Sequence, residues 1–463
     1  MKKLSFWTRK ILKIFVYIVS VAVFLIASIA IIFYASGYTF NWKTKQIRKT
    51  GILAIERLSE ENVRFFIDKK EVTPPKKIIP DPFTSPYRFT LAPGEYDLLI
   101  SKDGRLPYEE RVKIEPELVT IVRSVILIPQ TPTEEIMLET NAKKYAVSPD
   151  YKKIIYSEDG KNIILYDIGN KKKLAPEASK FFHGQAQNFF WDKKSEKVAI
   201  TFSDNNVTPN IAYIWDTVVE KNSYFLNQKL SYTPFCENFV FSPITANEFF
   251  CTARDQLYLI NIARKQTTSL DTKISFVNAY ENYIYYYRDK DRQVIRFDIT
   301  TQAKSVLVDK VDKEIDMAVY PASGSNYYMR NGGNLYLLSE GQPPELLDKK
   351  IGNVFMADTF YYMKDFEMWR WDKTKEEDKD GTKNGAIFIT RFSSNVSNLD
   401  NYPDSDYLFY ADSDSVSIIK SDGSRNTVIT KKANLAKAYL VNKKEILILE
   451  SHGDKIKLIA VEI

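Results

Sequence analysis

A repeated unit of short strands fills the chain from Tyr145 onward and restricts the possible folds more than any other feature. Each unit holds a strand, a turn, an aromatic or β-branched strand, a second turn with Gly, Asn or Asp, and a further strand that ends near Asp. The units end about 31 to 51 residues apart, the period of four-stranded propeller blades. One unit cannot bury both of its faces, so we expect the units to stack in a ring. We count eight units, which favours eight blades, with seven as the alternative.

The last unit shows only three evident strands, and the chain stops at Ile463. A short apolar segment, Glu135 to Leu138, lies directly before the first unit, where a closing strand is expected. An unpaired edge would otherwise remain exposed. We therefore predict that Glu135 to Leu138 pairs with the final unit and closes the ring.

Two turns in this region carry a resemblance. The segment Val147-Ser148-Pro149-Asp150, which leads to Ile155-Tyr156-Ser157, is echoed by Phe241-Ser242-Pro243 and resembles TolB-like and Trp-Asp-repeat propellers. Later units lack the Ser-Pro-Asp turn. The resemblance implies a fold that presents loops to partners, and we interpret Ser148, Pro149 and Asp150 as a structural turn.

A second all-β unit is predicted from Gly51 to Pro129, because short apolar runs alternate with Pro-Gly and Asp-Gly turns. The phrase Leu91 to Tyr96 (LAPGEY), followed by Lys102-Asp103-Gly104 and Pro107-Tyr108, resembles a PEGA domain. That family implies a small β-sandwich on prokaryotic surface proteins, without catalytic residues. The chain departs from the family where Lys69 follows Asp68 in place of the usual turn glycine.

The N-terminal region holds 21 residues, Ile14 to Tyr34, without a charge, proline or glycine. At about 1.5 Å per residue a helix of this length matches a hydrocarbon core of about 30 Å. The alternatives are a cleaved signal peptide and a buried helix. Because a short Lys- and Arg-containing tail precedes the run, we expect a single-pass protein of the cell membrane, with a cytoplasmic N-terminus and an extracytoplasmic bulk.

Charge argues against a nucleic-acid partner. The chain carries 65 Lys or Arg and 59 Asp or Glu. Residues 1–50 hold nine of the basic residues and no acidic one, so acidic residues slightly outnumber basic ones in the rest. A nucleic-acid role would require a basic face on the folded part.

Only two cysteines occur, Cys236 and Cys251, and they bracket a predicted hairpin. Two buried free thiols are the default expectation. A disulfide between neighbouring strands is the alternative in an oxidising compartment.

No catalytic constellation stands out. The two histidines, His183 and His452, lie in unrelated units, and nucleophilic catalysis usually needs a histidine base. Glu376, Asp378 and Asp380 imitate the opening of a calcium loop, but Ile387 occupies the position where an EF-hand needs Glu. We interpret Lys373 to Lys383 as a solvated insertion. Four further acidic residues flank the predicted strand Tyr407 to Tyr410, namely Asp404, Asp406, Asp412 and Asp414. We interpret them as loop charges, with a calcium site as the minor alternative.

The expected protein is mainly β, with no enzyme activity and no cofactor: a membrane-anchored scaffold of the cell envelope whose propeller binds a protein or glycan. One alternative is a hydrolase or lyase of envelope polymers with carboxylates at the propeller mouth. Another is an envelope assembly factor that docks on membrane proteins. The expected parts are a tail 1–13, a transmembrane helix 14–34, a connector 35–50, a PEGA-like sandwich 51–129, a linker 130–134 and a propeller 135–463.

Overall fold

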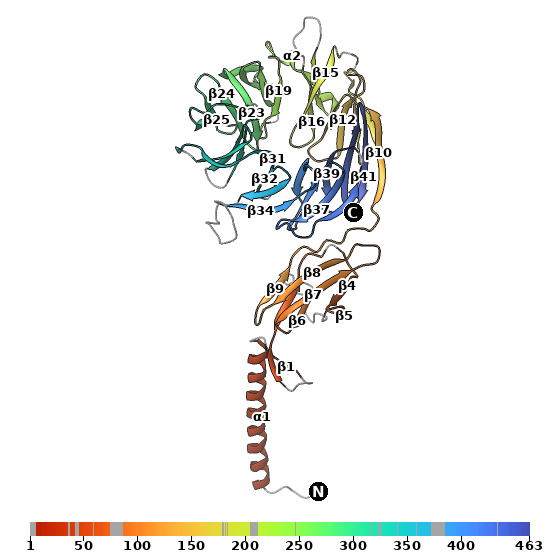
Figure 1. Ribbon diagram of the computed structural model, residues 1–463, viewed down its shortest axis with the longest axis vertical. Coiled ribbons are helices and arrows are strands. Elements are labelled where there is room, and N and C mark those ends of the chain that lie inside the picture. The colour runs from red at the N-terminus through yellow and green to blue at the C-terminus, as the bar shows by residue number, and fades with distance from the viewer. Residues whose placement is uncertain are drawn as a thin grey trace. The chain divides into compact units, whose positions relative to one another are not determined.

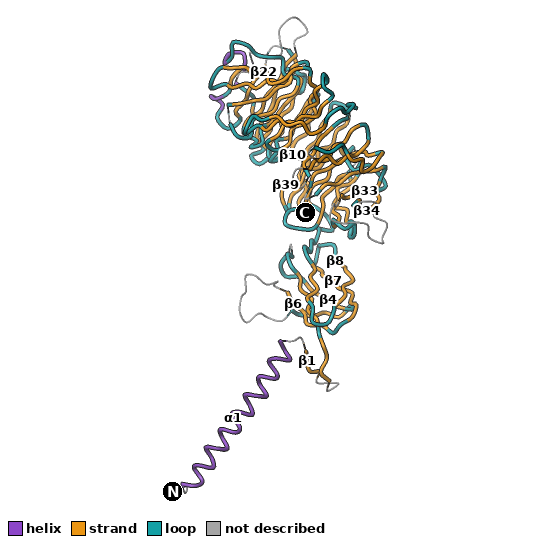
Figure 2. The backbone as a smooth tube through the Cα atoms, turned by 90° about the vertical axis from the view of Figure 1, so that its left-hand side faces the viewer, coloured by secondary structure: helices purple, strands orange, loops and turns teal. Residues whose placement is uncertain are grey.

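The computed structural model divides the chain into two compact units (Figure 1). Unit 1 comprises Met1–Thr131 with Asp404–Asp406, and unit 2 comprises Pro132–Pro403 with Tyr407–Ile463. Strands dominate both units (Figure 2). The structure describes residues 6–463 except 36–37, 42–45, 59, 75–86, 178–179, 181, 183, 204–211, 246, 315, 323–325, 340, 358, 372–384 and 433.

The N-terminal helix, α1, runs over Phe6–Ala35, and its side chains are described from residue 15 to residue 29. Across the residues that the structure describes, no helix is both long enough and apolar enough to cross a membrane. The predicted single-pass membrane localisation, with a cytoplasmic N-terminus, is therefore wrong.

The rest of unit 1 is a small hairpin followed by a two-sheet sandwich. The hairpin pairs β1 (Tyr38–Asn41) with β2 (Gln46–Lys49). One sheet of the sandwich has the order β6-β3-β9, and the other has the order β5-β4-β7-β8. Their bounds are β3 Gly51–Ile55, β4 Arg64–Ile67, β5 Lys70–Val72, β6 Tyr87–Leu91, β7 Gly94–Ser101, β8 Tyr108–Ile114 and β9 Val119–Val122.

Alternation explains how the sandwich forms. In β8 the side chains of Tyr108, Val112 and Ile114 are buried, whereas Glu109, Arg111 and Lys113 between them are not. Period-2 alternation of this kind places one face of a strand in the core. The buried side chains of both sheets meet in a single cluster that includes Leu53, Phe65 and Ile100.

Unit 2 contains eight four-stranded antiparallel sheets in the part of the chain that the structure describes. Seven consist of consecutive strands. Their bounds are β11 Lys144–Val147, β12 Lys153–Ser157, β13 Ile163–Asp167, β14 Lys172–Leu174; β15 Gln185–Trp191, β16 Lys197–Ser203, β17 Ala212–Asp216, β18 Tyr224–Phe225; β19 Asn238–Phe241, β20 Glu248–Ala253, β21 Gln256–Asn261, β22 Gln266–Thr272; β23 Ile274–Tyr280, β24 Tyr283–Arg288, β25 Gln293–Asp298, β26 Lys304–Val308; β27 Ala318–Pro321, β28 Asn326–Asn331, β29 Asn334–Ser339, β30 Glu345–Lys349; β31 Ile351–Met356, β32 Phe360–Lys364, β33 Glu367–Trp371, β34 Ala386–Arg391; β35 Asn398–Asn401, β36 Tyr407–Ala411, β37 Ser415–Lys420 and β38 Thr427–Lys431. Short helical turns occur at η2 (Glu220–Asn222) and α2 (Leu226–Lys229).

The eighth sheet joins the two ends of unit 2. Its order is β10-β41-β40-β39, with β10 Thr133–Asn141, β39 Leu435–Asn442, β40 Glu445–His452 and β41 Lys455–Glu462. Thr133 is paired with Glu462, and the ladder continues to the pair Asn141 and Lys455. In Figure 1, β10 accordingly lies beside β41. The predicted closing strand is confirmed.

Successive sheets pack face to face around the ring. For example, Ile154 and Tyr156 share one buried cluster with Leu447 and Leu458 of the eighth sheet. Similar clusters join the first sheet to the second and each later sheet to the next, as far as the seventh. The seventh meets the eighth where the Asn398 side chain donates a hydrogen bond to the Ala438 carbonyl, at 2.7 Å. This is a β-propeller arrangement, as the repeat predicts.

In most sheets the strand at the outer edge carries a β-bulge. The outer strand is the fourth strand of each consecutive sheet, and it is β10 in the eighth sheet. Six outer strands show the same register shift: β10, β22, β26, β30, β34 and β38. In β38 the shift lets Val428 stay exposed while the next residue, Ile429, is buried. A bulge therefore turns one more apolar side chain into the core, and it also disrupts the free edge of the sheet.

Cys236 and Cys251 form a disulfide, with their Cα atoms 5.4 Å apart. The default expectation of two free thiols is therefore wrong. Cys251 belongs to β20, opposite Phe239 of β19, and Cys236 lies just before β19. The hairpin register thus brings the two sulfur atoms together, which spacing alone did not determine.

Candidate functional site at the first turns of unit 2

The strand at the opposite end of each sheet from the outer strand is called the inner strand, and the eight inner strands are β11, β15, β19, β23, β27, β31, β35 and β39. Inner strands of neighbouring sheets contact each other, for example β11 with β15 and β23 with β27. The Asn278 side chain of β23 donates a hydrogen bond to Val319 O of β27 at 2.7 Å and accepts one from Val319 N at 2.9 Å. Asn353 of β31 donates likewise to Val396 O at 3.0 Å. The turn after each inner strand therefore belongs to one shared surface, which we call the first-turn face.

The Ser-Pro-Asp segment builds part of this face. Ser148 N donates to Lys153 O at 2.8 Å, and the Ser148 hydroxyl donates to Asp150 Oδ1 at 2.6 Å. Asp150 N donates to the hydroxyl of Ser195, in the first turn of the next sheet, at 3.0 Å. These contacts use the polar groups of the segment to hold two turns together, which fits the predicted structural role.

Tyrosines gather beside this turn. Tyr151 follows Asp150 with a positive φ of 60°, and its ring centroid lies 5.0 Å from that of Tyr439 on β39. Burial raises the pKa of Tyr151, of Tyr439 and of nearby Tyr145 on β11. All three therefore stay neutral near pH 7, and together they form an aromatic surface over two adjacent sheets.

Asp400 on β35 places a carboxylate next to these tyrosines. Its side chain is half-buried and accepts a hydrogen bond from Asn401 N at 2.8 Å. Burial raises the pKa of Asp400 above its ordinary value. The pKa of Tyr151 is raised mainly by its own burial and also by the negative charge of Asp400. Among the residues that the structure describes, no Lys, Arg or His forms an ion pair with Asp400.

Two other half-buried carboxylates of unit 2 are paired with a lysine. Asp271 lies 3.1 Å from Lys304 Nζ and accepts a hydrogen bond from the Tyr286 hydroxyl at 2.8 Å. Asp348 lies 2.6 Å from Lys364 Nζ. A desolvated charge is costly unless it is paired, and Asp400 differs from Asp271 and Asp348 in having no cationic partner among the described residues.

Of the acidic residues that the sequence suggested as metal ligands, those that the structure describes are not brought together as a site. Glu376, Asp378 and Asp380 lie outside the described residues, as does His183. Asp412 Oδ1 accepts hydrogen bonds from Ser415 N and from the Ser415 hydroxyl, at 2.7 and 2.9 Å, so this carboxylate stabilises its own turn. In the described part of the chain, no group of three or more His, Cys, Asp or Glu side chains is placed to hold a metal ion.

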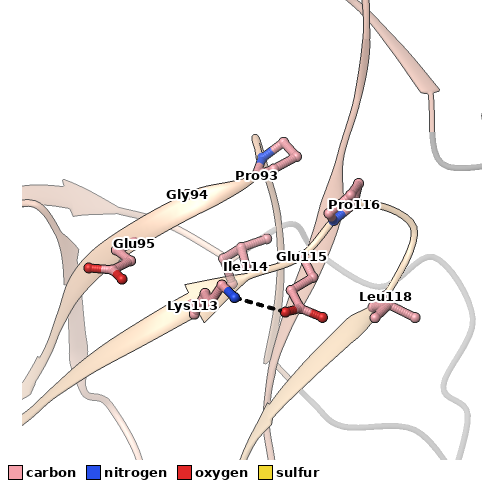
Figure 3. Close-up of a pocket in the computed structure, with 8 residues that line it drawn as sticks. All are labelled: Pro93, Gly94, Glu95, Lys113, Ile114, Glu115, Pro116 and Leu118. Carbon is pink, nitrogen blue, oxygen red and sulfur yellow. Dashed lines mark ion pairs between the residues drawn. The ribbon is translucent and has the colours of Figure 1, made fainter.

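Unit 1 has a shallow hollow of about 490 Å³ at one end of its sandwich (Figure 3). Apolar side chains line much of it: Pro93, Ile114, Pro116 and Leu118. Its charged residues pair with one another or with a neighbour. Lys113 lies 3.1 Å from Glu115, and Glu95 lies 2.9 Å from Arg111. The hollow is therefore apolar inside and close to neutral at its rim.

Comparison with known proteins finds only distant similarity. No family model matches the chain, so its likeness to PEGA domains stays a prediction. No curated protein matches it either. Among solved structures it is similar to the WD40 domain of SCAP from fission yeast, with a TM-score of 0.43 and 11% identity over 72% of this chain and 94% of that one.

Two further structures show the same level of similarity. The β-propeller domain of Cps50 (Swd1) from Myceliophteria thermophila has a TM-score of 0.37 and 9% identity, over 72% of this chain and 100% of that one. Dipeptidyl peptidase 4 from Porphyromonas gingivalis has a TM-score of 0.46 and 13% identity, over 68% of this chain and 57% of that one. Similarity at this level does not indicate an activity.

Proposed function

We propose that the chain is a non-enzymatic scaffold that binds a partner protein through the first-turn face of an eight-bladed propeller. In this proposal a basic side chain of the partner contacts Asp400, beside Tyr151 and Tyr439. The observation that carries the proposal is the half-buried Asp400 carboxylate, which lacks a cationic partner among the described residues.

Physical chemistry favours a cation at this position. A carboxylate that is partly removed from water gains most when a positive charge approaches it, because the surroundings screen the pair less than bulk water does. Aromatic rings nearby add attraction of about 0.5–2 kcal/mol for an ammonium or guanidinium group. Arginine and lysine side chains both satisfy these requirements, and both project far enough to reach a turn.

The enzymatic alternative is a hydrolase or lyase that uses carboxylates at the propeller mouth. Glycoside hydrolysis usually needs two acids about 5–9.5 Å apart. The groups that act electrostatically on Tyr151 and Tyr439 are Asp400 and other tyrosines. This arrangement favours recognition of a cation over acid–base catalysis.

An array of random twelve-residue peptides tests the proposal. We expect the full chain to select peptides rich in Arg or Lys, and we expect Asp400→Asn to lose that selection. Asp255→Asn is the matched control, because Asp255 is an exposed carboxylate on the turn between β20 and β21, at the other end of its sheet.

The comparison requires that both variants are folded, which a cooperative thermal unfolding transition of each variant shows. Equal Arg and Lys selection by Asp400→Asn and by the parent chain would contradict the proposal. Binding to oligosaccharides on a glycan array, without Arg or Lys selection on the peptide array, would replace the protein partner by a glycan.

A further inference from the structure

Strand β9 ends one sheet of unit 1 with a free edge. It pairs with β3 in parallel, and its other side has no strand in the described part of the chain. Ile52 N donates to Leu118 O at 3.0 Å, and Glu56 N donates to Val122 O at 2.9 Å. In a parallel ladder every second residue of a strand directs its N–H and C=O groups toward the neighbouring strand, and the residues between direct theirs to the other side. The backbone groups of Val119 and Ile121 therefore point away from β3.

Three side chains at this edge are apolar and exposed, whereas Val122 is buried and the Thr120 hydroxyl donates a hydrogen bond to Lys113 O of β8 at 2.8 Å. Leu118, Val119 and Ile121 are 55%, 52% and 41% exposed. The outer strands of unit 2 are also edges, but bulges interrupt six of them. β9 pairs in continuous register from Val119 to Val122 without a bulge. An uninterrupted apolar edge can accept a further strand, whereas a bulged edge resists one.

We propose that β9 pairs with β9 of a second copy of this chain, antiparallel and with the two-fold axis at Thr120. Val119 of one copy then lies opposite Ile121 of the other, and these are the two residues whose backbone groups point outward. Each such pair exchanges N–H and C=O hydrogen bonds in an antiparallel ladder. The same patch serves both copies, as an isologous contact requires.

Charge supports a second copy as the occupant. Glu117 and Arg123 lie three residues before and after Thr120, so the antiparallel pairing brings Glu117 of each copy toward Arg123 of the other. Arg123 is exposed and forms no ion pair among the described residues. Glu117 lies 3.1 Å from Lys49 within its own copy and is about half exposed, so it remains accessible to a second cation.

The hollow of unit 1 continues this edge, because Leu118 lines both (Figure 3). In the proposed pairing, Leu118 lies opposite Val122 of the second copy, and the chain after Val122 passes the hollow. A four-residue strand alone buries less than the roughly 1,200 Å² of a standard stable interface. The self-association is therefore weak and depends on concentration.

A cysteine at the two-fold axis tests the geometry in the full chain. Directly opposed residues of a non-hydrogen-bonded antiparallel pair have Cα atoms about 4.5 Å apart, within the disulfide range of about 4.4–6.8 Å. We expect Thr120→Cys to form a covalent dimer under mild oxidation, since both native cysteines are already bonded to each other. Thr427→Cys, on the bulged outer strand β38, is the control and should stay monomeric.

Sedimentation velocity over a range of concentrations provides the second measurement. Ile121→Lys should lower the dimer fraction of the chain at least tenfold. Val428→Lys should not change it, although Val428 is equally exposed, at 43% against 41%. A monomer at every concentration together with no Thr120→Cys dimer would overturn the proposal. A dimer that Ile121→Lys leaves unchanged would overturn it as well, and a captured partner strand without any homodimer would assign the edge to another protein.

Discussion

Replacing Leu138 by Ala tests whether β10 closes the ring in solution. Leu138 is 5% exposed and packs in the cluster that joins the eighth sheet to the first. Truncating a buried leucine to alanine costs about 2–5 kcal/mol, from lost transfer free energy and from the cavity left behind. Ile136 lies on the same strand but is 56% exposed, so Ile136→Ala should cost less than about 0.5 kcal/mol.

The backbone contribution of the closing strand is larger than that of one side chain. Eight residue pairs join β10 to β41. With about one hydrogen bond per pair and ~0.5–1.5 kcal/mol net for each bond, deleting the strand should cost roughly 4–12 kcal/mol. Deletion would also leave the edge of β41 unpaired.

Urea unfolding gives the free energies, and hydrogen exchange shows where they act. For Leu138→Ala we expect faster exchange in β41 and β40, with little change in β24 and β25 on a distant sheet. Ile136→Ala should leave all four strands as protected as in the parent chain. Equal effects of the two substitutions, or an unchanged β41 after deletion of residues 133–141, would refute the reasoning.

Three further changes have expected outcomes. Replacing Cys236 and Cys251 by Ser should lower the free energy of unfolding by about 3 kcal/mol, as read from urea curves, because the bridge closes a loop of about 15 residues. Asp400→Asn should raise the melting temperature at pH 7, because burial raises the pKa of the carboxyl and the folded state therefore favours the proton. That gain should vanish below about pH 4, where the parent Asp is protonated both folded and unfolded, and a gain independent of pH would contradict the cause. Gly423→Ala should destabilise the chain by at least about 1–3 kcal/mol in thermal melts, because φ is +85° there and an added Cβ would lie 1.9 Å from Ile389 O; an unchanged melting temperature would count against it.

Repetition made the architecture of unit 2 predictable. Each unit shows the same order of apolar strands and polar turns, so period alone indicated blades and placed their number at eight or seven. The closing strand at Glu135 to Leu138 followed because the last unit visibly lacked a strand. A closed ring leaves no strand edge unpaired between its ends, and Glu135 to Leu138 was the remaining apolar segment that could pair with the last unit.

The candidate site was not predictable in the same way. Asp400 stands one residue from a proline-containing turn and looks like any acidic residue beside a strand. Its significance depends on burial and on tyrosines from β39 and from the turn after β11, which lie about 40 and 250 residues away in the sequence. The sequence drew attention to Asp404, Asp406, Asp412 and Asp414, where the density of charge is higher. Charge density indicates solvated turns more often than a desolvated carboxylate.

The N-terminal prediction failed for a related reason. An uncharged run gives only the hydropathy of a segment, whereas the described part of the chain holds no helix that is both long and apolar enough to cross a membrane. The disulfide was left open because sequence spacing does not specify which positions of two strands face each other. The register of β19 and β20 supplies that information.

The pairing of β10 with β41 also determines when the ring can close during synthesis. Thr133 has to wait for its partner Glu462, roughly 330 residues later in the chain. At about 5–20 residues per second, a ribosome needs some 15–65 s to produce that partner. During this interval β10 has no pairing strand, while the seven sheets from β11 to β38 are synthesised. Ring closure therefore follows the synthesis of the other seven sheets, and unit 2 spends most of its own synthesis as an open arc.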